Sequence, residues 1–362
     1  MPELSPTRYF VRFGAALLGV LLAVWAYVLI FPMGFLESGY PSWVAKETML
    51  DECRLGRISF FGDSRVEAGI VPAALPVEAS NLGVAAGTPI EVYAAVQHTL
   101  QCEHLPNYVV ISLSANDFGP LSQFFWINSL RYGFVDRRYL REIEQTADRL
   151  GDDVTLSRAK TADGLSGWLR DWLYAAHFPT LYFSNLAQGQ LFRRYASNRE
   201  RLAAVLRDRG FVSYGGSGRP PARQRPEMAG TWPGRTPLHT VYFERTLQLL
   251  RDRGIAVGLL LTPVRQSGMP VGEPEKAHAE YLKSITRRFS NVQLINEQHP
   301  FWPASLFADG QHLSAEGARI FTTRLAGCVI GTAIRAGCDL DWHPEDQATA
   351  SLRQSPSAPI AQ

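Results

Sequence analysis

Four polar side chains, spread over most of the chain, are of the types needed for chemistry on an ester. Ser64 lies in the sequence FFGDSR, and Asn116 lies in SLSAND. Asp309 and His312 lie three residues apart in FADGQHLS. A serine hydroxyl can act as a nucleophile, an imidazole oriented by a carboxylate can act as its base, and an amide can donate to the oxyanion. These residues therefore predict an enzyme that transfers an acyl group through a serine ester.

The position of Ser64 is more informative than its motif. Gly-Asp-Ser alone is a weak signal, because three common residues coincide by chance. The motif follows the apolar run RISFF, however. A tight turn after a buried strand would expose the hydroxyl and direct backbone N–H groups at a substrate carbonyl. The alternative is that Ser64 caps the N-terminus of a helix. With the other three positions present, we interpret Ser64 as the nucleophile.

Asp309 and His312 are spaced so that both side chains belong to one loop. The carboxylate can accept the Nδ1 proton, which fixes the tautomer, while Nε2 faces a serine. Metal binding is the competing use of such a pair, but no second His/Cys/Asp cluster has ligand spacing, so we expect neither a metal nor another cofactor. His312 could also be a plain surface residue beside a helix N-cap at Ser314. We expect His299 near the site, and the histidines expected on the surface are His98, His104 and His278.

The oxyanion donors are predicted at two places. Asn116 directly follows a second apolar run, where its amide can donate to an oxyanion; the alternative is an ordinary turn asparagine. The loop NLGVAAGTP would add a backbone N–H at Gly87 or at its neighbour Ala86. Glycines also serve turns, so this loop is the more ambiguous of the two.

The elements that must position these residues alternate along the chain. Short apolar runs predict buried strands at residues 57–62, 108–113, 255–261 and 292–295. Helical spacing predicts helices at residues 90–101, 240–253, 275–289 and 315–336. Such alternation predicts an α/β fold with a parallel sheet and helices on both faces. Ligands bind at the carboxyl ends of the strands in these sheets, and the four polar residues all fall there.

Between residues 118 and 235 the alternation lapses. This region holds helical blocks at residues 137–150, 165–175 and 191–209, and a Gly/Pro/Arg-rich passage then returns the chain to the sheet. We interpret residues 118–235 as an insertion over the active face, with a mobile loop as its second part. An aromatic run could line an acyl or sugar site, although the core of a small subdomain is the better interpretation; its members are Phe124, Phe125, Trp126, Tyr132 and Phe134.

The N-terminal region is long and apolar enough to cross a membrane. Residues 13–36 carry no charge, and about 20 apolar residues span a bilayer. Arg8 and Arg12 precede them, so the positive-inside rule places residues 1–12 in the cytoplasm. We therefore expect a single-pass anchor in the inner (cytoplasmic) membrane, an exported catalytic domain at residues 37–342 and a disordered tail at 343–362. A cleaved signal or a buried core helix is the alternative.

Composition and cysteine usage limit the remaining possibilities. Lys and Arg number 36 against 34 Asp and Glu, which gives no basic surface for nucleic acid.

The four cysteines all lie on the exported side, where disulfides persist, and they allow three pairings. Cys53 with Cys102 is the first to test, because both precede strands and could meet at the bottom of the sheet. A bridge between Cys328 and Cys338 would require the helix at 315–336 to end early. Unpaired buried thiols are the alternative.

The order of these motifs resembles that of the SGNH/GDSL hydrolase superfamily. The resemblance covers Arg57 to Asn116 and Gly254 to about Ala336, and it implies a flavodoxin-like three-layer α/β domain. It also implies that Ser64 is the nucleophile and that Asp309 and His312 complete the triad. Asn116 and the Gly87 loop would form the oxyanion hole. Two departures stand out: Arg65 replaces the usual leucine after the serine, and SAND replaces GxND, which can align the donor glycine with Ala86.

A single anchor before such a domain is most similar to the membrane-tethered branch of that superfamily. Its DltD-like and alginate O-acetylation proteins work beside membrane-bound O-acyltransferases. The resemblance therefore implies a serine O-acyltransferase that acts on an exported cell-envelope polysaccharide, with an acyl donor and a membrane-bound O-acyltransferase as partner. The alternatives are an esterase of the same fold, acting on carbohydrate or lipid, and a catalytically idle scaffold for the acyltransferase.

Overall fold

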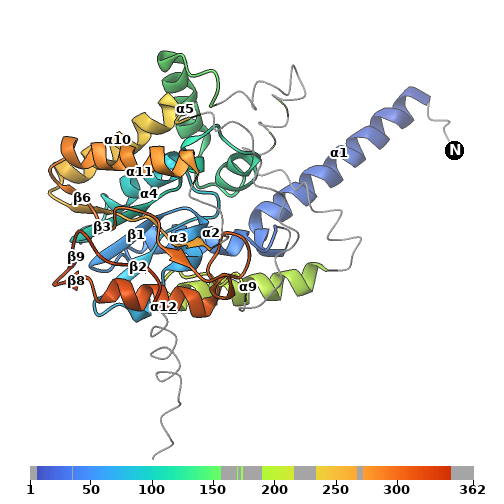
Figure 1. Cartoon of the computed structure of the whole chain (residues 1–362). Helices are drawn as coiled ribbons and strands as arrows, with labels where there is room; N and C mark the ends of the chain where they lie inside the picture. The colour runs from blue at the N-terminus through green and yellow to red at the C-terminus, as the bar shows by residue number, and fades with distance from the viewer. Residues whose placement is uncertain are drawn as a thin grey trace, which may run out of the picture.

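The computed structural model describes residues 6–34, 36–155, 169, 173, 190–215, 234–266 and 272–343. At its centre is a parallel five-stranded β-sheet with the order β2-β1-β3-β4-β6 (Figure 1). Its strands are β1 (Ile58–Gly62), β2 (Ala79–Asn81), β3 (Tyr108–Ser112), β4 (Ala256–Leu259) and β6 (Val292–Leu294). The predicted α/β class with a parallel sheet is confirmed. All four predicted strands are present, each within a few residues of its predicted bounds.

Side chains of the central strands alternate between two cores, one on each face of the sheet. Phe61 and Ile111 face the helices α4 (Pro89–Thr99), α10 (Pro237–Asp252) and α11 (Glu273–Arg288). Phe60 and Val110 face α3 (Ser64–Gly69) and α12 (Ala315–Ala326) on the opposite side (Figure 1). Burial on both faces explains why these strands are continuous apolar runs. The helices at 90–101, 240–253 and 275–289 are confirmed.

Strand β2 was not predicted from the sequence. Its residues, Ala79, Ser80 and Asn81, are small or polar and make no apolar run, so Asn81 was assigned to a loop. The strand is nevertheless fully buried. The Asn81 amide donates to the carbonyls of Val66 and Ile70, both at 2.8 Å, which satisfies its polar atoms in the interior.

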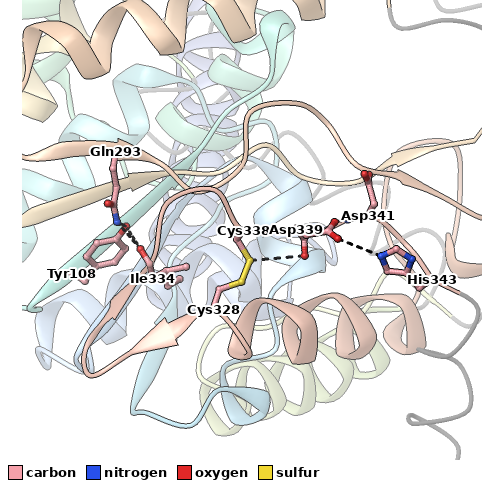
Figure 2. Close-up of a disulfide and its surroundings, with 8 residues drawn as sticks. All are labelled: Tyr108, Gln293, Cys328, Ile334, Cys338, Asp339, Asp341 and His343. Atoms are coloured by element: carbon pink, nitrogen blue, oxygen red, sulfur yellow. Dashed lines mark hydrogen bonds and ion pairs between the residues drawn. A yellow bond between two sulfur atoms is a disulfide. The ribbon is translucent and has the colours of Figure 1, made fainter.

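The helix expected at residues 315–336 is wrong in its second half. It ends at Ala326, and Gly327 is its C-cap. A short antiparallel hairpin follows, formed by β8 (Val329–Ile330) and β9 (Ala333–Ile334), and Gly331 turns it with a φ of +61°. The turn and the packing of Ile334 in the core outweigh the helical spacing of this segment. The early end allows Cys328 to bond to Cys338 (Figure 2).

Both disulfides join segments that lie outside the strands of the central sheet. Cys53 is bonded to Cys102, which confirms the pairing expected at the bottom of the sheet. Near the second disulfide, the side chains of Tyr108 and Gln293 both donate to the carbonyl of Ile334, at 3.1 and 2.6 Å (Figure 2). The disulfide therefore closes the chain around the hairpin, and hydrogen bonds from Tyr108 and Gln293 tie the hairpin to the central sheet.

The helix α1 (Pro6–Ile30) projects away from the α/β body (Figure 1). Its most apolar stretch has a mean hydropathy of 2.4 and is only 6% buried, so it is long and apolar enough to cross a membrane. It starts before the predicted residue 13 and ends before residue 36, because Pro32 begins a 3₁₀ turn, η1 (Pro32–Gly34).

Two further helices pack where α1 joins the body. These are α2 (Tyr40–Asp51) and α9 (Leu191–Arg207), which lie against each other. The Asn198 amide of α9 donates to the carbonyls of Met33 and Leu36, at 2.8 and 3.1 Å. The chain directly after α1 is therefore attached to the body by direct hydrogen bonds.

Of the region 118–235, the structure describes α5 (Arg137–Leu150), α9 and a π-helix, η4 (Phe125–Leu130). The helical block expected at 165–175 lies almost entirely outside the described residues, as do the Gly/Pro/Arg-rich passage at 216–233 and the tail from 344. In the aromatic run, Phe125 and Trp126 belong to a buried cluster, as favoured, whereas Phe124 is half exposed. The remaining short elements are η2 (Pro72–Ala74), η3 (Ala115–Phe118), η5 (Ala304–Leu306), β5 (Val264–Arg265) and β7 (Phe301–Trp302).

Candidate active site

Ser64 lies at the carboxyl end of β1, at the first position of α3. Asp63, not Ser64, caps this helix, since its carboxylate accepts from the Arg65 N–H at 2.9 Å. The alternative in which Ser64 is the cap is therefore wrong, and its hydroxyl is free for another partner. Gly62 makes the turn with a φ of +154°, and a Cβ there would lie 2.0 Å from the Ser112 carbonyl oxygen. Only glycine fits between the two central strands at this point.

The structure brings Ser64, His312 and Asp309 into one hydrogen-bonded line. Nε2 of His312 lies 2.8 Å from Oγ of Ser64, and Nδ1 lies 2.8 Å from Oδ2 of Asp309. The other carboxylate oxygen accepts the backbone N–H groups of Gln311 and His312, at 2.8 and 2.9 Å. The loop thus closes on the Asp309 side chain, and Ser314 caps α12 directly afterwards. This arrangement can move a proton from the serine to the imidazole.

The electrostatics of the loop favour an ionised Asp309. Partial burial would raise the pKa of this carboxyl, but the hydrogen bonds from Gln311 and His312 and the charge of a protonated His312 ring outweigh it. The pKa of Asp309 is therefore lowered. An ionised carboxylate at Nδ1 fixes the tautomer in which Nε2 can accept a proton and stabilises the imidazolium that results.

Asn116 is exposed within η3, directly after β3. The side chain of Asp117 accepts from the Ser114 N–H at 2.6 Å and from its hydroxyl at 2.8 Å, and this capping box orders the turn that carries Asn116. Because Gly62 pairs with Ser112 in register, the chain leaves β1 and β3 at the same edge of the sheet. Asn116 and Ser64 consequently line the same cavity.

The two alternatives for the backbone donor differ in the structure. The N–H of Gly87 already donates to the Val84 carbonyl at 3.0 Å. Ala86 lines the cavity and has a φ of +57°, which is unusual for a residue other than glycine. Ala86 is therefore the better placed of the two for donating to a ligand in the cavity.

The cavity at this end of the sheet has a volume of about 330 Å³. Ser64, His312, Asn116 and Ala86 all line it, and Asp309 lies behind the imidazole. Three lining residues come from the region 118–235, namely Phe124, Asn128 and Tyr214. The described part of that region therefore contributes to the walls of this cavity.

Arg65 and two carboxyl groups also line the cavity. The Nε of Arg65 lies 3.9 Å from Asp63. Burial raises the pKa of Asp117 well above its ordinary value, and the neighbouring charge of Asp63 raises it further, against the opposing effect of Arg65. In the wall beside Ser64, the positive charge of Arg65 thus partly balances the carboxyl groups of Asp63 and Asp117.

Tyr214 was missed by the sequence analysis. Its ring is stacked on that of His312, with centroids 4.3 Å apart and an angle of 19° between the planes. Its hydroxyl donates to the buried Glu67 at 2.8 Å. No motif marks Tyr214, which stands at the start of the Gly/Pro/Arg-rich passage, so no sequence signal could have identified it.

The remaining histidines have other environments. His278 was expected on the surface, but it is fully buried and its Nε2 hydrogen-bonds the Leu113 carbonyl at 3.0 Å. The expectation failed because this face of α11 packs on Phe118. His299 is buried, is bonded to the Thr262 carbonyl at 2.8 Å and does not line the cavity. No group of three His, Cys, Asp or Glu residues that could hold a metal exists among the described residues.

Comparisons with protein-family models, with curated proteins and with solved structures give no match to this chain.

Proposed function

We propose that the protein is a membrane-anchored serine O-acyltransferase of the SGNH/GDSL type. The observation that carries the proposal is the continuous line of hydrogen bonds from Ser64 through His312 to Asp309 at the carboxyl end of the sheet. The strand order β2-β1-β3-β4-β6 supports it, because counting only these strands gives 2-1-3-4-5, the flavodoxin-like order. The cavity in front of the serine provides room for an ester.

The proposed reaction has two halves. In the first, Nε2 of His312 takes the proton of Ser64 while Oγ attacks the carbonyl carbon of the acyl donor. Donors from Asn116 and the Ala86 backbone stabilise the oxyanion, and the donor's leaving oxygen departs with the proton. In the second, an acceptor hydroxyl gives its proton to His312 and attacks the acyl-enzyme, and Ser64 leaves and recovers the proton.

The proposed acceptor is a hydroxyl of an exported cell-envelope polysaccharide. The apolar helix α1 supports an anchor in the inner membrane, and the positive charges near its start favour a cytoplasmic N-terminus. Two disulfides in the following domain agree with export, since disulfides persist outside the reducing cytoplasm. A membrane-bound O-acyltransferase is the proposed partner and source of the acyl group.

Labelling with a fluorophosphonate tests whether Ser64 is a nucleophile. The full-length wild-type protein in detergent should be labelled, Ser64→Ala should not, and Ser122→Ala should be labelled like wild type. Ser122 is a matched control because its hydroxyl accepts from the N–H of Phe124, which lines the cavity, while Ser122 itself lies outside the lining. Absence of labelling in the wild type would contradict the proposal and favour the idle scaffold.

An esterase of the same fold is the second candidate, because it would use the same three residues. Products formed from an acyl donor in the presence and absence of glycan separate the two activities. Acylated glycan as the main product supports the transferase, and free acid at an unchanged rate supports the esterase.

A further inference from the structure

The segment 210–215, which follows α9, is fixed in place by buried polar groups of two other elements. The ammonium group of Lys46, on α2, is fully buried and donates to the carbonyls of Gly210 and Asn81, the latter at 2.7 Å. The N–H of Val212 donates to the carbonyl of Glu67 at 3.1 Å. Buried polar groups with such partners hold one conformation, because losing a partner is costly.

Glu67 provides the next attachment. It lies on α3, one turn after Ser64, and only 1% of its surface is exposed. Burial raises the pKa of Glu67, and Lys46 and the hydroxyl of Tyr214 oppose this rise. The hydroxyl of Tyr214 is thus bound to an acceptor that cannot move away into solvent.

This attachment places the Tyr214 ring parallel to the imidazole of His312. The imidazole is then held at one edge by Asp309 and covered on one face by Tyr214. Only 15% of the His312 side chain remains exposed, although its partner Asp309 is 48% exposed. Restricting the ring is relevant to rate, because displacing a reacting group by about 1 Å costs about 100-fold.

We propose that Tyr214 is a positioning residue for His312 that also limits hydrolysis of the acyl-enzyme. By stacking, it keeps Nε2 directed at Ser64. By covering a face of the ring, it reduces the directions from which water can approach the base during release of the acyl group. Removing the ring should therefore slow acylation and, relative to acylation, speed release to water.

This inference rests on the proposed function. Kinetics with a short aryl ester distinguish failure of the inference from failure of the proposed function. With p-nitrophenyl acetate and the full-length protein, the initial burst reports acylation of Ser64 and the steady rate reports release to water. Tyr214→Ala should lower the acylation rate about tenfold, and the ratio of release to acylation should rise several-fold. Tyr214→Phe keeps the ring but loses the hydrogen bond to Glu67, so its acylation rate should lie between those of the wild type and Tyr214→Ala.

Tyr195→Ala is the matched control, since Tyr195 is a partly exposed tyrosine on α9 outside the cavity lining. It should match the wild type in both rates. A purely structural role for Tyr214 would slow both steps equally and lower the melting temperature in parallel, which would overturn the inference. If the wild type gives no burst and no labelling, the proposed function itself fails.

Discussion

Two regions meet on His312, and they hold it by different means. The loop 309–312 is local: its carboxylate and imidazole lie three residues apart, and backbone N–H groups within the same turn fix the carboxylate. The segment 210–215 reaches the same ring only through buried contacts with Lys46 and Glu67 on two other helices. The comparison shows that one side chain can depend both on a short motif and on the complete fold.

The largest expected effect is on the reaction rate, and it comes from a substitution in the loop 309–312. Asp309→Asn should lower the acyl-transfer rate by about 10⁴-fold, because the amide favours the wrong imidazole tautomer. The melting temperature should change little, since Asp309 is about half exposed. Single-turnover acylation by p-nitrophenyl acetate measures the effect.

Asp339→Asn is the matched control. Asp339 also pairs with a histidine, His343, at 3.4 Å, but neither residue lines the cavity that holds Ser64. Its loss should leave acylation unchanged. Equal losses in the two variants would mean that the Asp309 carboxylate has no special part in the site.

A substitution that removes the support of the segment 210–215 should mainly lower the stability of the fold. Lys46→Met leaves two carbonyls without their donor and removes the positive charge that acts most strongly on Glu67. It should lower the free energy of unfolding by about 3 kcal/mol. Urea unfolding measures it, and adding Glu67→Gln should recover part of the loss. Lys276→Met is the control: Lys276 is 58% exposed, and its loss should cost under about 0.5 kcal/mol. An unchanged stability in Lys46→Met would show that the segment does not depend on this group.

The smallest expected effect per residue concerns two histidines that are buried outside the lining of the cavity. Burial lowers the pKa of His239 to about 4 and that of His278 to about 3. Unfolded histidine titrates near about 6.5, so below that pH the unfolded chain binds more protons than the folded one. Their stabilisation is therefore complete above about pH 6.5 and decreases as the pH falls, by about 2 kcal/mol per histidine at pH 5.

Thermal unfolding between about pH 7.5 and pH 5 measures this dependence. The melting temperature should fall with pH, and His239→Gln should flatten the slope. His104→Gln serves as the control, because His104 is exposed. The same slope in both variants would show that His239 does not account for the acid sensitivity.

The sequence predicted those features that depend on local patterns. Apolar runs between polar turns identified four strands, and the polar residues after them identified Ser64 and Asn116 at one edge of the sheet. Strand β2 was not predicted because it has no run of apolar residues. It forms because neighbouring elements bury it. Tyr214 was also not predicted, because its position depends on contacts with Lys46 and Glu67, which lie far from it in the sequence.

The attachment of α9 to the chain after α1 has a consequence for how the protein works. The amide of Asn198 donates hydrogen bonds to the carbonyls of Met33 and Leu36. The guanidinium of Arg194 donates a further hydrogen bond to the Leu36 carbonyl, at 3.4 Å. These contacts fix the position of α1 relative to the α/β body. If α1 stands in a bilayer, Ser64 would therefore remain at a fixed height above the lipid surface.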